Sequence, residues 1–337
     1  MPELTEQIDE RQWEELLHTS PTATPFQSPS FARFLDGLSC VEVFRLGVSE
    51  SGVLKGVAVA MLQYEGGAVR RHFTRRAIVN GGPLLAGDIS DAAASLLMEE
   101  CAKRLYHKAI YLETRNLHDY NPYRKALQQA GFRYESHYNF QLAVASQPES
   151  RYHSNRRHEF RNALRQGVQT VWDPPLNQVR EMYGLLQRLY THRVRKPLLP
   201  WEFFEAARGM EGVHYLVALT PDGVVAGGMM VVDLDKRSRY VWYECSDEHL
   251  RRFKIPTVLY HTAIQQCVEL GIGLFDFMGA GRPGDGGYGV RDFKAQFGGT
   301  LVEQGRYIHI LHPLLYRIGS MAVAVMRNTG TRTRHGK

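Results

Sequence analysis

Residues 41–67, VEVFRLGVSESGVLKGVAVAMLQYEGG, and residues 213–246, VHYLVALTPDGVVAGGMMVVDLDKRSRYVWYECS, decide the fold. Each stretch reads as an apolar β-run, a tight turn and a second β-run rich in valine and glycine. The turns, SESG and TPDG, carry residues that tolerate tight-turn dihedrals. The chain therefore contains two similar hairpins, which indicates an internal repeat.

The sequence after each hairpin repeats as well. Helices are expected at Asp91–His107 and at Pro256–Leu270, because both stretches place apolar residues at i, i+3 and i+4 spacing. A strand is expected after each helix, AIYLETRN at 109–116 and LFDFMG at 274–279. The order hairpin, helix, strand predicts two copies of one α/β unit.

A closing segment completes each copy. YRKALQQAGFRYESHYNFQLAV at 123–144 and VRDFKAQFGGTLVEQGRYIHIL at 290–311 both read as a short helix, a glycine stop and two strands. Gly131 aligns with Gly298 in this comparison, and Arg124 aligns with Arg291. The repeat thus extends over the whole α/β unit.

A polar, proline-containing stretch, SQPES at 146–150, separates the two copies. We expect a first domain over residues 1–150 and a basic helical linker over 151–200. A second domain over 201–337 would then include a C-terminal helix. The four cysteines are scattered and form no CxxC pair, so no metal site is expected.

The linker begins with RYHSNRRHEFRNALRQG at 151–167, a predicted helix with five arginines and one glutamate. A second helical stretch at 176–194 ends beside Arg195. Either the first helix is a solvated linker, or its arginines face phosphates, since they concentrate positive potential. Arg156 and Arg195 are therefore candidate substrate-binding residues.

The composition is that of a globular protein: 337 residues, 44% hydrophobic and 23% charged. A disordered chain, a collagen and a coiled-coil rod are excluded. The net charge of +6 suits an anionic partner. The N-terminus is acidic and amphipathic, unlike a secretory signal, and no apolar run approaches 18 residues. We therefore expect a cytoplasmic protein.

Gly279, Gly281 and Gly284 fit the spacing GxGxxG after a predicted strand. A dinucleotide-binding turn needs a helix to open there, and the chain instead continues with Pro283 and further glycines. We interpret the stretch as a glycine loop that closes over a ligand, because long loops that only connect are uncommon. Gly279 and Gly281 are thus candidate substrate-binding residues.

The stretch LFDFMGAGRPGDGGYGVRDFKAQFGGTLVEQGRY at 274–307 resembles the closing motif of the Fem family of N-acyltransferases and their BioF-type acetyltransferase relatives. TPFQSPSFARF at 24–34 resembles that family's entry motif, and the linker sequence RRHEFRNALRQGV is similar too. The matching residues of the closing motif are Phe275, Asp276, Phe277, Gly279, Gly281, Phe293, Lys294, Phe297, Gly298 and Gly299.

The resemblance implies an α/β fold of two tandem GNAT-like domains, the fold of acyl-CoA N-acyltransferases. It implies an N-acyltransferase that moves an acyl or aminoacyl group onto an amine of a small molecule or of a peptidoglycan-type cell-envelope precursor. The donor would be aminoacyl-tRNA, as in Fem proteins, or acyl-CoA, and no further cofactor is required. The alternative is a non-catalytic tandem-GNAT module that binds an anionic ligand.

Two positions depart from the family pattern. GNAT enzymes that hold coenzyme A carry a glycine-containing loop before the main helix, and the matching stretch here is RRFKIP at 251–256. Lys254 and Pro256 stand where glycines would be, and Pro256 has no N–H to donate. In the first copy, Arg115 stands where Fem proteins often carry an aspartate, with Glu113 two residues earlier.

Candidate site residues follow from the motif and from the chemistry. An amine that attacks a carbonyl needs a cation or N–H near the oxyanion, and Lys294 is the candidate. Asp276 could orient the amine or accept its proton. Tyr243, followed by Glu244 in YVWYECS, suits an ammonium. Phe293 could stack on a base, and Arg291 is a further substrate-binding candidate.

The C-terminal stretch HPLLYRIGSMAVAVMRN at 312–328 places apolar residues at helical spacing, and a basic tail follows it. Either this helix docks on the second domain, or it is a peripheral anchor on an anionic membrane. The oligomeric state is left open.

Overall fold

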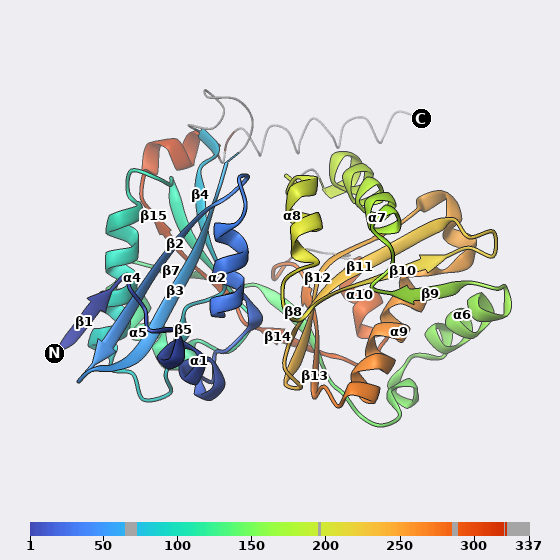
Figure 1. Cartoon of the computed structure of the whole chain (residues 1–337), viewed down its shortest axis with the longest axis horizontal. Helices are drawn as coiled ribbons and strands as arrows, with labels where there is room; N and C mark the ends of the chain where they lie inside the picture. The colour runs from blue at the N-terminus through green and yellow to red at the C-terminus, as the bar shows by residue number, and fades with distance from the viewer. Residues whose placement is uncertain (65–72, 195–196, 285–288, 320, 322–337) are drawn as a thin grey trace. The chain divides into compact units, whose positions relative to one another are not determined.

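The computed structural model describes residues 1–64, 73–194, 197–284, 289–319 and 321. The chain divides into two compact units (Figure 1). The first unit consists of Met1–Glu135 and Gly305–Lys337, and the second unit is Ser136–Gln304. Both combine a twisted sheet with helices, as expected for the α/β class.

The first unit is built on a sheet in the order β1-β2-β3-β4-β6-β15-β7, with β5 paired to β3. β4 and β6 are parallel, and the other pairs are antiparallel. The strands are β1 Pro2–Thr5, β2 Glu42–Glu50, β3 Val53–Gln63, β4 Arg76–Gly81, β5 Leu84–Leu85, β6 Tyr111–Asn116, β7 Arg133–Glu135 and β15 Arg306–Ile310.

The α-helices of the first unit are α1 Glu10–Thr19, α2 Pro29–Asp36, α4 Asp91–Leu105 and α5 Arg124–Gln129. α4 begins where the Ser90 hydroxyl accepts from the Ala93 N–H, a regular N-cap. Its periodic residues Leu97, Cys101 and Leu105 are buried in the core of this unit. The helix predicted at Asp91–His107 is thereby confirmed, with two residues fewer at its end.

The second unit repeats this topology in the order β9-β10-β11-β12-β13-β8-β14. Its strands are β8 Tyr138–Ala143, β9 Gln169–Trp172, β10 Val213–Leu219, β11 Val225–Leu234, β12 Ser238–Ser246, β13 Leu274–Gly279 and β14 Thr300–Glu303. Its α-helices are α6 Ser154–Arg165, α7 Leu176–Leu189, α8 Trp201–Ala207, α9 Ile255–Leu270 and α10 Gly289–Ala295.

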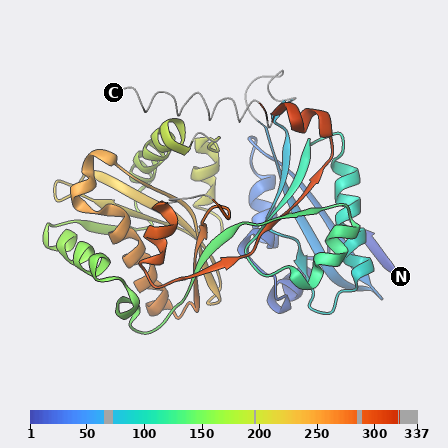
Figure 2. The same cartoon turned by 180° about the vertical axis from the view of Figure 1, so that it is seen from behind.

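α6 and α9 lie side by side, as Figure 2 shows. α9 is apolar around much of its surface, and Leu259, Ala263 and Cys267 on it are buried in the core of the second unit. The helix and the strand predicted at Pro256–Leu270 and 274–279 are confirmed within one residue. A five-residue π-turn, Tyr190–Val194, follows α7.

Each sheet takes one strand from the other half of the sequence. β8, which precedes the linker, pairs with both β13 and β14, and β15, near the chain end, pairs with both β6 and β7. The pairing buries Phe140 and Leu142 of β8 in the second core. The unit boundaries therefore fall at residues 136 and 305 rather than at the expected positions of 150 and 200.

The predicted C-terminal helix lies mostly outside the described residues. Residues 313–319 are helical. Leu314, Ile318 and Met321 are 70%, 41% and 60% exposed. Among the described residues, no helix has the length and apolarity needed to cross a bilayer.

Candidate functional site

The two central parallel strands of the second unit diverge. β12 and β13 pair at three positions only, Ser238–Tyr240 against Leu274–Asp276, although both strands continue beyond them. The register of β11 and β12 also shifts between Met230 and Val231, which leaves Trp242 as the extra residue of a bulge. The carboxyl ends of β12 and β13 thus form the two sides of a wedge.

Glu244 on β12, which is half-buried, and Tyr260 on α9, which is buried, form a hydrogen-bonded pair beside this wedge. The Tyr260 hydroxyl donates to Glu244 Oε2 at 2.7 Å. Burial raises the pKa of Glu244 above its ordinary value, although the Tyr260 hydrogen bond and the charge of Lys294 act in the opposite direction. Glu244 is therefore a carboxylate whose proton affinity is increased.

Lys294 on α10 closes the other side of the wedge. Its Nζ donates to the carbonyl oxygens of Phe277, Met278 and Gly279 at 2.7, 3.0 and 2.9 Å, and the residue is 6% exposed. Burial lowers the pKa of Lys294 to about 8, against the opposing charges of Glu244 and Asp276. Its role as an oxyanion donor stays a prediction, because three backbone carbonyls take up the three N–H groups of the ammonium in this structure.

Asp276 is fully buried and holds the end of β13. Its Oδ1 accepts from the Met278 N–H at 2.6 Å, and its Oδ2 accepts from Gln141 Nε2 at 2.9 Å. Met278 has φ +53°, in the left-handed region, so the Asp276 side chain fixes a tight turn there. Burial raises the pKa of Asp276 to about 6. These contacts give Asp276 a structural role at the end of β13. Its catalytic role stays a prediction.

A cavity of about 440 Å³ opens at the start of α9. Four cationic and four acidic side chains line it, together with Phe293 and Thr257. The cations at its rim are exposed: the side chains of Arg251, Arg193 and Lys254 are 69%, 51% and 49% accessible. These cations pair with acids of the same cavity, Arg193 and Arg251 with Glu248 and Lys254 with Glu159. The mouth thus carries mixed charge, and Glu244 is a half-buried acid in the wall.

The backbone at the start of α9 offers few amides to a phosphate. Lys254 adopts φ +53°, a conformation that favours glycine, so the backbone keeps a glycine-like shape although the residue is lysine. Pro256 has no N–H, and the N–H groups of Thr257 and Val258 donate to the Lys254 carbonyl at 2.9 and 3.3 Å. Phosphate groups in this cavity would therefore be held mainly by side chains.

Two of the predicted binding residues meet at this cavity. The Arg156 guanidinium lies 5.1 Å from the Phe293 ring centroid, and its Nη1 donates to Thr257 Oγ1 at 3.0 Å. Glu159 accepts from both Arg156 and Thr257. Glu159 and Thr257 of this hydrogen-bonded cluster were not predicted as site residues. The sequence offered one signal for them, because Glu159 is the single acid of the basic helix.

Four other predicted residues, all within the described part of the chain, do not line the cavity. Tyr243 lies in an aromatic cluster, its ring centroid 4.9 Å from that of Phe204. Arg291 donates to the carbonyls of Ala280 and Arg282, which braces the described part of the glycine loop. Gly279 accepts from Lys294, and Gly281 needs its φ of +82°. Arg195 lies outside the described residues.

Glu244 is the functional candidate that the sequence alone undervalued. It follows Tyr243 in the sequence, but the bulge at Trp242 was not visible, so the side on which each residue points could not be assigned. Tyr260 was not predicted as a site residue, because it lies among the apolar residues of the predicted helix at 256–270. Within the described residues, no group of three or more His, Cys, Asp or Glu side chains could hold a metal ion.

Residues 150–295 match the family model described as an acetyltransferase (GNAT) domain. This segment is thus similar in sequence to GNAT acetyltransferase domains. It contains the diverging strands, α9 and Lys294, so the cavity lies within it. The enzyme class expected from the sequence, an acyltransferase, is confirmed by this match. No curated protein matches the chain.

The fold of the whole chain is similar to that of FemX, with a TM-score of 0.70, 13% identity, and coverage of 94% of this chain and 99% of that chain. L-PGS from Bacillus licheniformis is similar at a TM-score of 0.59 and 12% identity, over 93% and 96% of the two chains. A tandem GNAT protein from the clavulanic acid biosynthesis pathway gives 0.57 and 14%, over 93% and 99%. The expected tandem GNAT fold and the Fem-like resemblance are confirmed at the level of fold.

Replacing Asp276 by Asn should remove a pH dependence of stability. The pKa of Asp276 is about 6 in the folded protein against 3.8 for the free group, so the folded state binds the proton more tightly. Wild-type stability should therefore fall, relative to Asp276→Asn, as the pH rises from about 4 to about 6, by about 3 kcal/mol. Urea unfolding of both proteins at several pH values measures the difference. A difference that does not vary with pH would show that Asp276 titrates normally.

Proposed function

We propose that the protein is an N-acyltransferase whose second unit binds the acyl donor in the cavity at the start of α9. The amine nitrogen attacks the donor carbonyl carbon and a C–N bond forms. The bond from this carbon to the donor sulfur or oxygen breaks, and the leaving group takes up a proton. Glu244 accepts the proton that the amine loses. The observation that carries this proposal is a half-buried carboxylate in the wall of the cavity.

Glu244 suits this part for two reasons. A general base works best when its pKa lies near the working pH, and burial raises the pKa of Glu244. The hydrogen bond from Tyr260 also fixes its orientation, because Tyr260 is itself 1% exposed. Lys294 adds a fixed positive charge on the opposite side of the wedge.

The donor is aminoacyl-tRNA or acyl-CoA, and the arginines of α6 favour the first. Arg157, Arg161 and Arg165 recur at intervals of four residues and so form one stripe on the helix. Two hollows of about 530 and 630 Å³ lie along this stripe. Spaced cations on a helix suit the phosphates of a nucleic acid backbone. The acceptor is an amine of a small molecule or of a cell-envelope precursor, as the Fem resemblance suggests.

Replacing Glu244 by Gln should slow transfer by about 10²-fold or more, the usual contribution of a general base. The amide oxygen of the new side chain can still accept from Tyr260, so the fold should be kept. Purified protein is incubated with labelled acyl-CoA or charged tRNA and an amine-containing envelope extract, and the amide product is identified by mass. The matched control is Glu205→Gln, which changes an exposed glutamate on α8.

A rate for Glu244→Gln within threefold of wild type would remove Glu244 from the mechanism. Absence of any amide product from wild-type protein with both donors would favour the non-catalytic, anion-binding module.

The double change Arg161→Gln and Arg165→Gln should weaken tRNA binding and reduce its salt dependence. Each lost phosphate contact should lower the slope of log K against log salt by about 0.7 to 0.9. Filter binding at several salt concentrations gives the slope. The control Arg33→Gln with Arg45→Gln removes two exposed arginines from the first unit. Equal slopes in wild type and in the α6 variant would exclude the stripe as the tRNA contact.

We further propose a cytoplasmic protein that touches the membrane through its C-terminal segment. Leu314 and Ile318 are exposed and lie four residues apart, so they share one helix face. The change Leu314→Asp with Ile318→Asp should abolish co-sedimentation with liposomes of anionic lipid. The change Val53→Asp with Val224→Asp, at two other exposed apolar residues, is the control. If wild type does not sediment with the liposomes, the membrane contact is wrong.

A further inference from the structure

Both units carry a carboxylate at the same place in their sheets. Glu113 is the third residue of β6, and Asp276 is the third residue of β13. Each of these strands lies between a parallel neighbour and the strand taken from the other half of the chain. The partners of the two carboxylates differ, however: Asp276 meets neutral donors, whereas Glu113 meets arginines.

The first unit has no open wedge beside this strand in the part of the chain that the structure describes. β4 and β6 pair at five positions, from Ala77 with Leu112 to Gly81 with Asn116, the last residue of both strands. The loop after β4 is held by buried side chains: Tyr120 donates to the Gly81 carbonyl at 2.9 Å and Gln27 to the Gly82 carbonyl at 2.7 Å. The place that corresponds to the donor cavity is therefore closed in the described part of the first unit.

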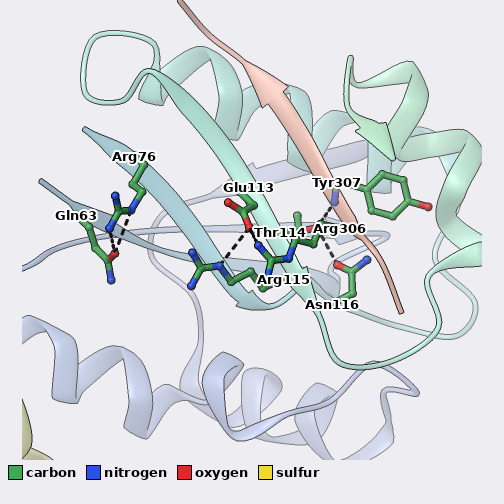
Figure 3. Close-up of polar contacts among 8 residues, drawn as sticks. All are labelled: Gln63, Arg76, Glu113, Thr114, Arg115, Asn116, Arg306 and Tyr307. Atoms are coloured by element: carbon green, nitrogen blue, oxygen red, sulfur yellow. Dashed lines mark hydrogen bonds and ion pairs between the residues drawn. The ribbon is translucent and has the colours of Figure 1, made fainter. Parts of the chain in front are cut away.

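Two arginines bind Glu113 on this sheet, and a third, Arg76, binds Gln63 instead (Figure 3). Arg306 Nη1 and Arg115 Nε both donate to the same oxygen, Glu113 Oε1, at 2.6 and 3.2 Å. Arg76, on the neighbouring strand β4, donates to Gln63 Oε1 at 3.2 and 3.3 Å. One buried carboxylate thus meets two cations.

The two arginines that bind Glu113 carry one more positive charge than this carboxylate can neutralise. Burial by itself would raise the pKa of Glu113, but the charges of Arg115 and Arg306 outweigh it and hold the pKa below its ordinary value. Glu113 is therefore ionised and balances one cation. Glu135 lies opposite Arg306 in the register of β15 and β7, which limits the excess charge of Arg306. Arg115 remains as a cation whose side chain is 40% exposed.

The geometry of Arg115 suits a ligand. Its Nε is held by Glu113, which fixes the plane of the guanidinium before any ligand arrives. Among the described residues its one ion pair is made through this Nε, and the N–H groups of its two terminal nitrogens can bind two oxygens of one planar or tetrahedral anion. An oriented arginine fork that is partly exposed on a sheet face can bind a carboxylate or a phosphate.

We propose that Arg115, oriented by Glu113, forms a binding site for a carboxylate or phosphate group on the first unit. Arg115, Glu113 and Arg306 all belong to this unit, so the site is independent of the donor cavity of the proposed function.

Isothermal titration of the full-length protein with inorganic phosphate and, separately, with acetate tests the proposal at constant ionic strength. Wild type should bind at least one of the two, and the tighter one identifies the acid group. Arg115→Gln should weaken this binding about tenfold or more, because the fork and its charge are lost. Arg115→Lys, which keeps the charge without the fork, should recover only part of it.

Two further variants distinguish anion binding at Arg115 from binding elsewhere on the chain. Glu113→Gln removes the internal carboxylate that competes for Arg115 and should tighten anion binding, whereas Arg33→Gln, on the surface of the same unit, should leave it unchanged. Thermal melting verifies that each variant is folded. Unchanged affinity in folded Arg115→Gln, or no saturable binding of either anion by wild type, would overturn the proposal. Glu244→Gln should bind the anion normally, so failure of the catalytic proposal would be seen separately.

Discussion

The opening in the second unit depends on how the end of β13 satisfies its backbone polar groups. Once β12 turns away after three pairs, carbonyls and N–H groups of β13 lose that neighbour. Lys294 supplies three donors to consecutive carbonyls, and Asp276 accepts the Met278 N–H. Unpaired buried backbone groups are costly, so these two side chains let the strands stay apart. The opening beside Glu244 depends on that separation.

The elements that could be predicted from the sequence are those with a local signal. The hairpins, α4 and α9 follow from periodicity and turn residues, which short stretches of sequence carry in full. The exchange of β8 and β15 could not be predicted, because a short β-run does not identify its partner. For Lys294, the motif marked a residue that proves to be buried against three carbonyls. That environment could not be predicted, since a lysine in a short helix with polar neighbours reads as exposed. The bulge that orients Glu244 depends on the pairing with β11 and has no local signal.

The two units show how side chains at equivalent positions change the surface of one fold. The strand that follows the main helix carries an acid at its third position in both units, Glu113 and Asp276. In the second unit the acid supports an open wedge. In the first, the parallel strands stay paired to their ends, Tyr120 and Gln27 fill the adjoining space, and arginines surround the acid. A few side chains at equivalent positions therefore separate a cavity-forming unit from a unit with a charged sheet face.

The exchanged strands also affect how the chain folds during synthesis. The first sheet needs β15, whose residues 306–310 are made after the entire second unit. Until then β6 and β7 lack the strand that joins them, and two strand edges remain open to wrong partners. Pairings over nearly two hundred residues are slow to form because loop closure is unfavourable. The second unit, complete once β14 has emerged, can fold first and leave the closing of the first sheet as the last step.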